Sequence, residues 1–465
     1  MAEFVVIRQE IQAMRETVKI NNAITQGVIW KQLLAFFFPV LMGTLFQQLY
    51  NAVDAVIVGR FVGKAALAAV GGSAAHILSL IIGFFTGVSS GAAVIISQYY
   101  GAGDDEDVSR AVHTALILAA AGGAVMTALG LVTAPWLLRI MNTPAETMAD
   151  SLVYLQAIYA GMIPGMLFNM GSAILRAVGD SRRPLYFLMA CCGVNILLDL
   201  LFVIKLHMGV MGAAVATVIA QSISAVLVLL HMARSGESYR LVPRALRPDR
   251  RIFRRTVRIG LPAGVQSIMY GLSNLIITVA VNGFGTDTVA AWVAMSKIDT
   301  LNWMTLNALG VSLMTFAGQN YGARQLARVR SSLKSAILMG LAMALGVCAL
   351  FFAQGRNLLL LFTDDPAVLE IALLIVLYIA PWYFTYAPIE IFSGCFRGLG
   401  DTLIPTLITA AGVCLIRVVW VFTVVPAWRD IRSVSISYPI SWCITSLAFT
   451  VYYFAVVRRK RLTDQ

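Results

Sequence analysis

Long apolar segments alternate with short polar breaks along nearly the whole chain. The first apolar segment begins near Leu33 and the last ends near Val456. About twelve of them are long enough for a membrane-spanning helix, which needs about 20 residues. A span must also satisfy its own backbone hydrogen bonds, which an α-helix does. The pattern therefore predicts an all-α integral membrane protein with twelve transmembrane helices.

Composition agrees with this prediction. Of 465 residues, 59% are hydrophobic and 12% are charged, and the mean hydropathy is +0.80. A water-soluble protein would have to hide nearly all the apolar segments without enough charged surface to cover them. Residues 1–31 carry scattered charges and have neither an apolar signal core nor a small-residue cleavage site, so we expect a cytoplasmic segment and no signal peptide.

Several short motifs occur twice at a nearly constant distance. RAVGDSRRP begins at Arg176 and RGLGDTLIP begins at Arg397, a separation of 397 − 176 = 221 residues. QYYGA at Gln98 and QNYGA at Gln319 have the same separation, 319 − 98 = 221. A steady offset indicates duplication of one unit. Because that unit has an even number of spans, six, the two lobes should run parallel.

Charge along the chain predicts its orientation. Lys and Arg gather in alternate loops, which the positive-inside rule assigns to the cytoplasm together with both termini. The arginine-rich run from Arg234 to Arg258 lacks interleaved aromatic residues, so we interpret it as a linker against anionic lipid headgroups, not a nucleic-acid site. The expected domains are an N-terminal segment (1–31), an N-lobe (32–232), the linker (233–256), a C-lobe (257–457) and a cytoplasmic tail (458–465).

Three acidic residues lie inside apolar segments. Asp54 follows Asn51 by three residues, and Asp199 follows Asn195 by four, so each acid shares a helix face with an amide. A carboxylate in the hydrocarbon region costs about 2.5 kcal/mol or more, so such acids point to function. Glu390 is the third. It stays open whether Glu390 faces a cavity or lies close enough to a span end to be solvated.

The duplication serves as an internal control. At the positions equivalent to Asp54, Asn195 and Asp199 the second half has apolar or aromatic residues, namely Ile277, Ile416 and Trp420. A purely structural polar contact could have been kept in both halves. We therefore predict that the acids are confined to the first half and that this half carries the ion chemistry; buried hydrogen-bonded groups without a transport role are the alternative.

Other polar residues within the spans give weaker signals. Lys297 and Asp299 are two residues apart, a spacing that turns them away from each other on one helix. Arg417 is expected to be paired or to extend towards the interface, and His76 to be a hydrogen-bonded packing residue. We interpret all six cysteines as free thiols and predict neither a metal site nor a cofactor. No nucleophile with a neighbouring base is visible, which argues against an enzyme.

The motifs together resemble the multidrug and toxic compound extrusion (MATE) family, in its bacterial efflux branch. The resemblance covers the chain from about Lys31 to Arg461, and the order and spacing of the motifs are more specific than any one of them. The residues that carry it are Pro39 with Asp54, Val58–Gly59, QYYGAG, RAVGDSRRP, NILLD at Asn195–Asp199, GLPAGVQ at Gly260–Gln266 and RGLGD at Arg397–Asp401.

The resemblance implies two six-helix lobes around a central cavity, with alternating access driven by a proton or sodium gradient. It assigns an ion-coupling site in the N-lobe and a bend in the first helix at Pro39. The carboxyl-lobe acids of other members fall at Tyr270 and at Tyr386 instead of Glu390, so a C-lobe ion site is not implied. The ion-coupling residues it implies are Asp54, Asn195, Asp199 and Thr217.

The sequence thus predicts an ion-coupled antiporter of the plasma membrane that exports cationic or amphipathic drugs. The alternative is a lipid or glycan-lipid flippase of the same superfamily, which would need a cavity rich in Arg and Lys. We expect a monomer, small-molecule substrates and contact with membrane lipid. The candidate substrate-binding residues are Asn51, Tyr270, Tyr386 and Glu390.

Overall fold

The computed structural model describes residues 24–458, and every regular element in that range is a helix. Ten helices are long and apolar enough to cross a membrane, or eleven when α6 and α7, bent by 54° at their junction, are counted as one span. A twelfth, α11, is 37 residues long but carries polar residues such as Lys297 and Asp299. The described residues therefore confirm the predicted all-α, twelve-helix architecture.

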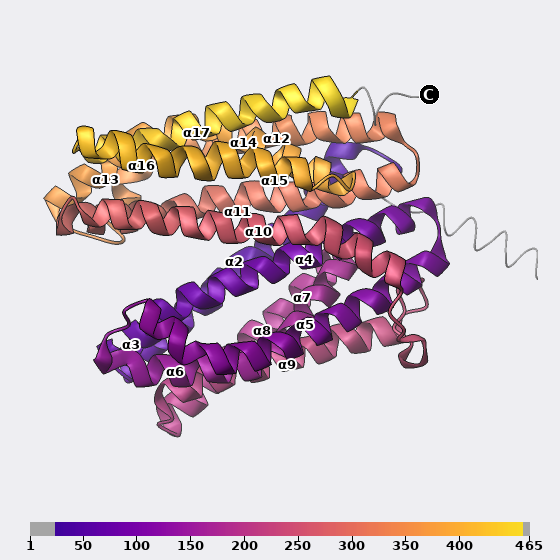
Figure 1. Ribbon diagram of the computed structural model, residues 1–465, viewed down its shortest axis with the longest axis horizontal. Helices are drawn as coiled ribbons and strands as arrows, with labels where there is room; N and C mark the ends of the chain where they lie inside the picture. Colours follow the sequence, from indigo (N-terminus) through magenta and orange to yellow (C-terminus); the bar gives the residue numbers. More distant parts are fainter. Residues whose placement is uncertain (1–23, 459–465) are drawn as a thin grey trace, which may run out of the picture.

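The helices form two lobes that separate clearly in Figure 1. Residues 235–249 connect them and contain only the short turn η2 (Pro243–Ala245), because α10 already begins at Arg250 within the segment 233–256 expected as a linker. The N-lobe contains α2 (Ile29–Phe61), α3 (Lys64–Gly71), α4 (Ser73–Ala102), α5 (Asp105–Ile140), α6 (Ala145–Ala160), α7 (Met162–Ala177), α8 (Arg182–Asp199), η1 (Leu200–Lys205) and α9 (Gly209–Arg234). The C-lobe contains α10 (Arg250–Asn282), α11 (Thr286–Gly322), α12 (Leu326–Leu359), α13 (Pro366–Ile379), η3 (Ala380–Trp382), α14 (Tyr383–Gly398), α15 (Leu403–Thr409), η4 (Ala410–Leu415), α16 (Ile416–Ala427), α17 (Ile431–Tyr452) and η5 (Tyr453–Val457).

Aspartates in the polar breaks start several of these helices. The side chains of Asp104, Asp249 and Asp430 each accept a hydrogen bond from a backbone N–H in the first turn of α5, α10 and α17. Such caps satisfy N–H groups that have no partner within the helix. In the repeated motif, Gly179 adopts a left-handed φ of 99° and Asp180 caps α8. The predicted helix–turn–helix connector is thus confirmed.

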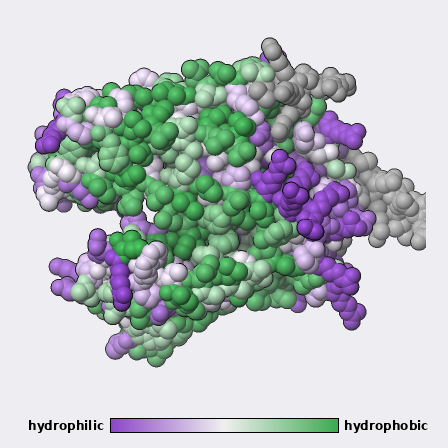
Figure 2. All heavy atoms as spheres, viewed as in Figure 1, coloured by the Kyte–Doolittle hydropathy of each residue, from purple (hydrophilic) through white to green (hydrophobic). Residues whose placement is uncertain are grey.

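The lobes meet at one end, here called the closed end, and diverge at the other, the open end (Figure 1). The surface is hollowed between them at the open end (Figure 2). Glycines allow the close approach: a Cβ built on Gly87 would lie 2.3 Å from the backbone N of Gly264, and one on Gly91 would lie 2.6 Å from that of Gly260. Small residues at such crossings let helix backbones pack directly.

The repeated motifs form two equivalent ties across the closed end. Gln98 Nε2 of the N-lobe donates to the carbonyl of Gly398 at 2.8 Å. Gln319 Nε2 of the C-lobe donates to the carbonyl of Ala177 at 2.7 Å. The two donors and the two acceptors are each 221 residues apart (319 − 98 and 398 − 177), so each lobe grips the other through the same motif.

Helix α2 belongs to both lobes. Leu33, Phe36 and Phe37 near its start are buried in the C-lobe core, where Phe36 packs edge-on against Phe316. Ile57 and Val58 near its end are buried in a cluster within the N-lobe. The helix continues through Pro39 between these two regions. Residues 32–37, expected to belong to the N-lobe, thus pack with the C-lobe.

Arg328 of α12 fastens the start of α2 to the C-lobe. Its guanidinium donates hydrogen bonds to the carbonyls of Ile24, Gln26 and Gly27 just before the helix. Several charge-assisted bonds from one arginine hold a short segment firmly. The first turns of α2 should therefore move with the C-lobe.

We predict that Gly322→Ala weakens the closed end. A Cβ at this position would lie 1.9 Å from the carbonyl oxygen of Gln98, and overpacking of this kind costs about 1–3 kcal/mol. Thermal unfolding of the purified protein in detergent should show a lower melting temperature.

Gly346→Ala in α12 is the matched control, because its Cβ would meet open space. Replacing a helical glycine by alanine there should be neutral or stabilising, by up to about 1 kcal/mol. Equal melting temperatures for the two variants would contradict the close packing at Gly322.

Candidate functional site

Four polar side chains from three helices converge inside the N-lobe. Asp54 of α2 faces Asp199 of α8 and Thr217 of α9. Asn195, one turn before Asp199, donates from Nδ2 to the Thr217 hydroxyl oxygen at 3.5 Å. Asp199 and Asn195 are 0% and 1% exposed, although α8 lies in a segment that reads as a membrane span. The structure thus brings together all four predicted ion-coupling residues.

The N-lobe cluster has more acceptors than donors. Both carboxylate oxygens of Asp199, and Oδ1 of Asp54 and of Asn195, are buried without a hydrogen-bond donor among the described residues. An unsatisfied buried acceptor costs about 1–3 kcal/mol, and a charged one costs more. Two neighbouring carboxylates also repel each other unless a proton or cation lies between them. The cluster is therefore suited to hold a proton or a small cation.

The helix that carries Asp199 changes its winding directly after it. Residues Leu200–Lys205 form the π-helical turn η1, which follows α8 without a break. π-Turns are rare and occur often at functional sites, because the wider turn alters which backbone and side-chain groups face inward. The sequence NILLDLLFVIK gave no sign of this change.

A separate cavity of about 510 Å³ lies in the C-lobe, between α10, α11, α14 and α17. Four aromatic residues form much of its wall: Tyr270, Trp292, Trp303 and Tyr438. Its charged lining residues are Asp299, Glu390 and Arg397. The cavity therefore combines aromatic faces with more acidic than basic groups.

Tyrosines hold the two acids of this cavity. Asp299 accepts hydrogen bonds from Tyr383 Oη at 2.5 Å and from Trp303 Nε1 at 3.1 Å. Glu390 accepts one from Tyr386 Oη at 2.6 Å. These bonds fix the orientation of each carboxylate. The prediction that membrane acids are confined to the first half is thus wrong, and Glu390 faces a cavity.

Arg417 lies beside this cavity in an arrangement that the sequence did not indicate. It is 1% exposed, and its guanidinium stacks 3.9 Å from the ring centre of Tyr438. Its Nε donates to the Ser441 hydroxyl at 2.9 Å. Arg417 therefore does not extend towards the membrane surface; a stacked cation–π contact is worth about 2 kcal/mol or more when desolvated.

The remaining predicted residues are divided between wall and surroundings. Tyr270 lines the C-lobe cavity, as expected of a substrate contact, whereas Tyr386 is buried behind it and positions Glu390. Asn51 has an exposed side chain one turn before Asp54, and Lys297 is exposed and does not line the cavity. All six cysteines are free thiols.

Sequence reasoning gave little weight to Asp299 and did not select the two cavity tryptophans. The signal that could have found them is helical spacing. Asp299 and Trp303 are four residues apart on α11, and Ser296 and Thr300 continue the same polar face within a membrane helix.

Comparison with known proteins places this geometry in a family. The MatE family model matches residues 39–201 and 262–423, one segment in each lobe and together more than half of the chain. The probable multidrug resistance protein YoeA of Bacillus subtilis is 26% identical over 443 residues, which cover 94% of this chain and 96% of that protein. The multidrug export protein MepA of Staphylococcus aureus is 22% identical over 352 residues, covering 75% and 77%.

The fold is likewise shared with a solved transporter. A structure described as the outward-facing conformation of a multidrug resistance MATE family transporter of the MOP superfamily has a TM-score of 0.89 and 22% identity, and covers 96% of this chain and 99% of that one. Two matched segments in two six-helix lobes, with relatives along nearly the whole length, lead to one conclusion: this chain belongs to the MatE family, as a multi-pass membrane protein of its bacterial multidrug efflux branch.

Proposed function

We propose that this protein is an antiporter that exports cationic or amphipathic small molecules by alternating access, driven by inward flow of H⁺ or Na⁺. The observation that carries the proposal is the convergence of Asp54 and Asp199 in the N-lobe, with buried carboxylate oxygens that lack donors. Such a cluster binds a proton or cation more tightly when its surroundings are closed to water.

Helix α2 supplies the coupling in this proposal. Its first turns are fastened to the C-lobe through Arg328, and its last turns carry Asp54 into the N-lobe. A cation bound between Asp54 and Asp199 removes their repulsion and draws the end of α2 inward, so the helix must bend where its hydrogen bonding is weakest, at Pro39. An ion with different affinities for the two arrangements then shifts the equilibrium between them.

The C-lobe cavity is the proposed place for substrate. Its volume of about 510 Å³ is typical of small-molecule sites. Trp292 and Trp303 offer faces to a flat cation, while Asp299 and Glu390 supply the opposite charge. A lipid or glycan-lipid flippase would need basic groups for phosphate, and Arg397 is the one basic residue among the described residues of this lining.

The same proposal sets the protein in the plasma membrane as a monomer with both termini in the cytoplasm. The closed end then faces the cytoplasm, and the described arrangement is open to the outside. The coupling cation is the sole cofactor in this scheme, substrates are small molecules, and neither catalysis nor nucleic-acid binding is part of it.

Asp54→Asn and Asp199→Asn should each abolish gradient-driven efflux. Asn keeps the side-chain shape but cannot alternate between a charged and an occupied state, so the ion gradient no longer acts on the conformational equilibrium. Ethidium accumulation in cells expressing each variant should rise to the level of cells without the protein, while membrane insertion stays normal.

Glu146→Gln is the matched control, because Glu146 is exposed at the start of α6, outside both clusters, and should leave efflux intact. Glu390→Gln should chiefly alter which compounds are exported. Full activity of both aspartate variants together with loss of activity in Glu390→Gln would move ion coupling to the C-lobe and overturn this assignment.

The proposed orientation is tested by single cysteines at the two ends. Gly103→Cys and Gly236→Cys lie in closed-end loops with open space around them. A membrane-impermeant thiol reagent should label both only after cell lysis. Thr286→Cys, between α10 and α11 at the open end, should label in intact cells. Labelling of Gly103→Cys or Gly236→Cys in intact cells would reverse the orientation.

A further inference from the structure

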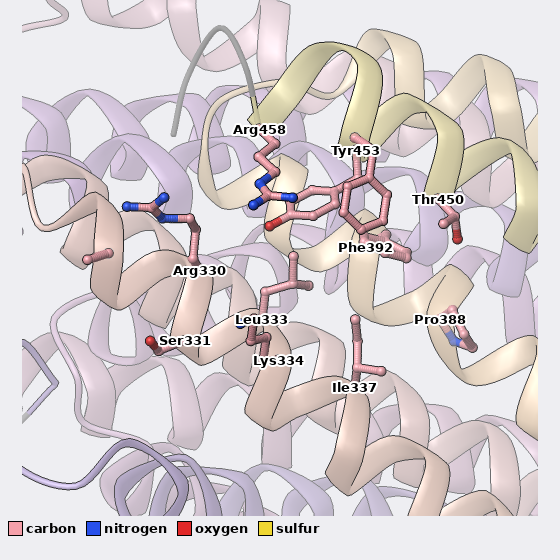
Figure 3. A pocket seen from close by; sticks show the side chains of 12 residues that line it. Arg330, Ser331, Leu333, Lys334, Ile337, Pro388, Phe392, Thr450, Tyr453 and Arg458 are labelled. Atoms are coloured by element: carbon pink, nitrogen blue, oxygen red, sulfur yellow. The ribbon is translucent and has the colours of Figure 1, made fainter. Parts of the chain in front are cut away.

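A second cavity in the C-lobe lies at the closed end, apart from the proposed substrate cavity. It has a volume of about 570 Å³ and lies between α12, α14 and the end of α17 (Figure 3). Arg330 and Lys334 line it from α12, and Arg458 lines it from the residue after η5. Its described lining includes neither Asp nor Glu, so the site is strongly cationic.

The lining changes from basic to apolar away from the closed end. One turn beyond Lys334, α12 contributes Ile337, and the opposite wall contributes Tyr453 and Phe392 (Figure 3). Beside this wall, Leu338 and Phe454 are 68% and 51% exposed. Exposed apolar side chains on a membrane helix contact lipid, so the cavity opens towards the acyl chains. Its occupant should have an anionic head and an apolar tail.

The wall formed by η5 has unusual backbone geometry. Residues Tyr453–Val457 form a π-helical turn at the end of α17, directly before Arg458. π-Turns are frequent at functional sites. The sequence from Arg458 to Arg461 is RRKR, so further positive charge follows in the chain and a second protein segment of that charge is a poor occupant.

The equivalent place in the N-lobe shows what is missing here. Helices α5 and α12 correspond at the offset of 221, since 334 − 113 = 221 places His113 opposite Lys334. His113 is buried because the linker covers it: its Nε2 accepts from the backbone N of Val242 at 3.0 Å, and Thr114 Oγ1 accepts from that of Asp249 at 3.0 Å. The shared buried positions are Val108 and Val329, Ala111 and Ser332, and Ala115 and Ala336.

We propose that this cavity binds one anionic phospholipid in the place that the linker takes in the first lobe. The headgroup phosphate lies among Arg330, Lys334 and Arg458, which supply charge-assisted hydrogen bonds. One acyl chain follows the apolar wall at Ile337 and Phe392. Basic pockets between membrane helices are known to take lipid headgroups of this kind. The site is independent of the proposed antiport.

The test measures the melting temperature of the full chain in detergent with three additives. These are dioleoylphosphatidylglycerol, dioleoylphosphatidylcholine with the same acyl chains but no net charge, and inorganic phosphate. The first should raise the melting temperature, and the other two should not. In Lys334→Gln/Arg458→Gln the half-effective concentration of phosphatidylglycerol should rise roughly 30-fold, because each interfacial cation contributes about fivefold.

Arg139→Gln/Arg429→Gln is the control, because it removes two exposed cations near the open end and should keep the wild-type response. An equal response in both double variants would overturn the site. An equal shift with phosphatidylcholine would overturn the role of charge, and an equal shift with phosphate would replace the lipid by a free anion. Should the first double variant fail to fold, Lys334→Glu at an exposed position should lose the response; an unchanged response would also overturn the site.

Discussion

The arrangement of this protein depends on a reciprocal contact between two copies of one motif. Gln98 and Gln319 each satisfy a carbonyl at the end of a helix in the opposite lobe, and glycine one turn later lets the backbones touch. At Gly101 a Cβ would lie 2.0 Å from the carbonyl oxygen of Gln319, so no larger residue fits. A helix end whose carbonyls are buried needs such donors. The lobes are thereby held together at one end, which leaves the other end as the place where they can part.

This constraint explains why α2 matters more than its position at the edge suggests. If the lobes pivot about the closed end, an element anchored in both must change shape. Helix α2 is anchored in the C-lobe by Arg328 and in the N-lobe by Ile57 and Val58, and Pro39 lies between these anchors. Its polar residue Asp54 lies beyond the proline, on the part that belongs to the N-lobe. The charge of one carboxylate and the shape of one helix are thus physically linked.

Sequence alone predicted the spans, the duplication and the convergence of Asp54, Asn195, Asp199 and Thr217. Hydropathy and fixed offsets are properties of the chain itself, and i to i+3 or i+4 spacing places an amide and an acid on one face. What escaped prediction depends on lateral packing. Nothing in the order of residues indicates that Phe36 enters the C-lobe core, that Arg417 stacks on Tyr438, or that η1 follows Asp199. Comparing equivalent positions of the halves also missed Asp299, because the acids of the second lobe lie on different helices from those of the first.

The two lobes show how a duplicated unit diverges under unequal constraints. Where the copies touch each other, any change must suit both partners, and the Gln and Gly positions are the same in both. Inside each lobe that requirement is absent. The position of Asp54 is taken by Ile277 in the second lobe, and polar groups reappear elsewhere as Asp299 and Glu390 around an aromatic cavity. The outer face of α5 is covered by a linker that α12 cannot have, because no third lobe follows. Identity of sequence between the halves therefore marks where the lobes bind each other, and difference marks where each has its own chemistry.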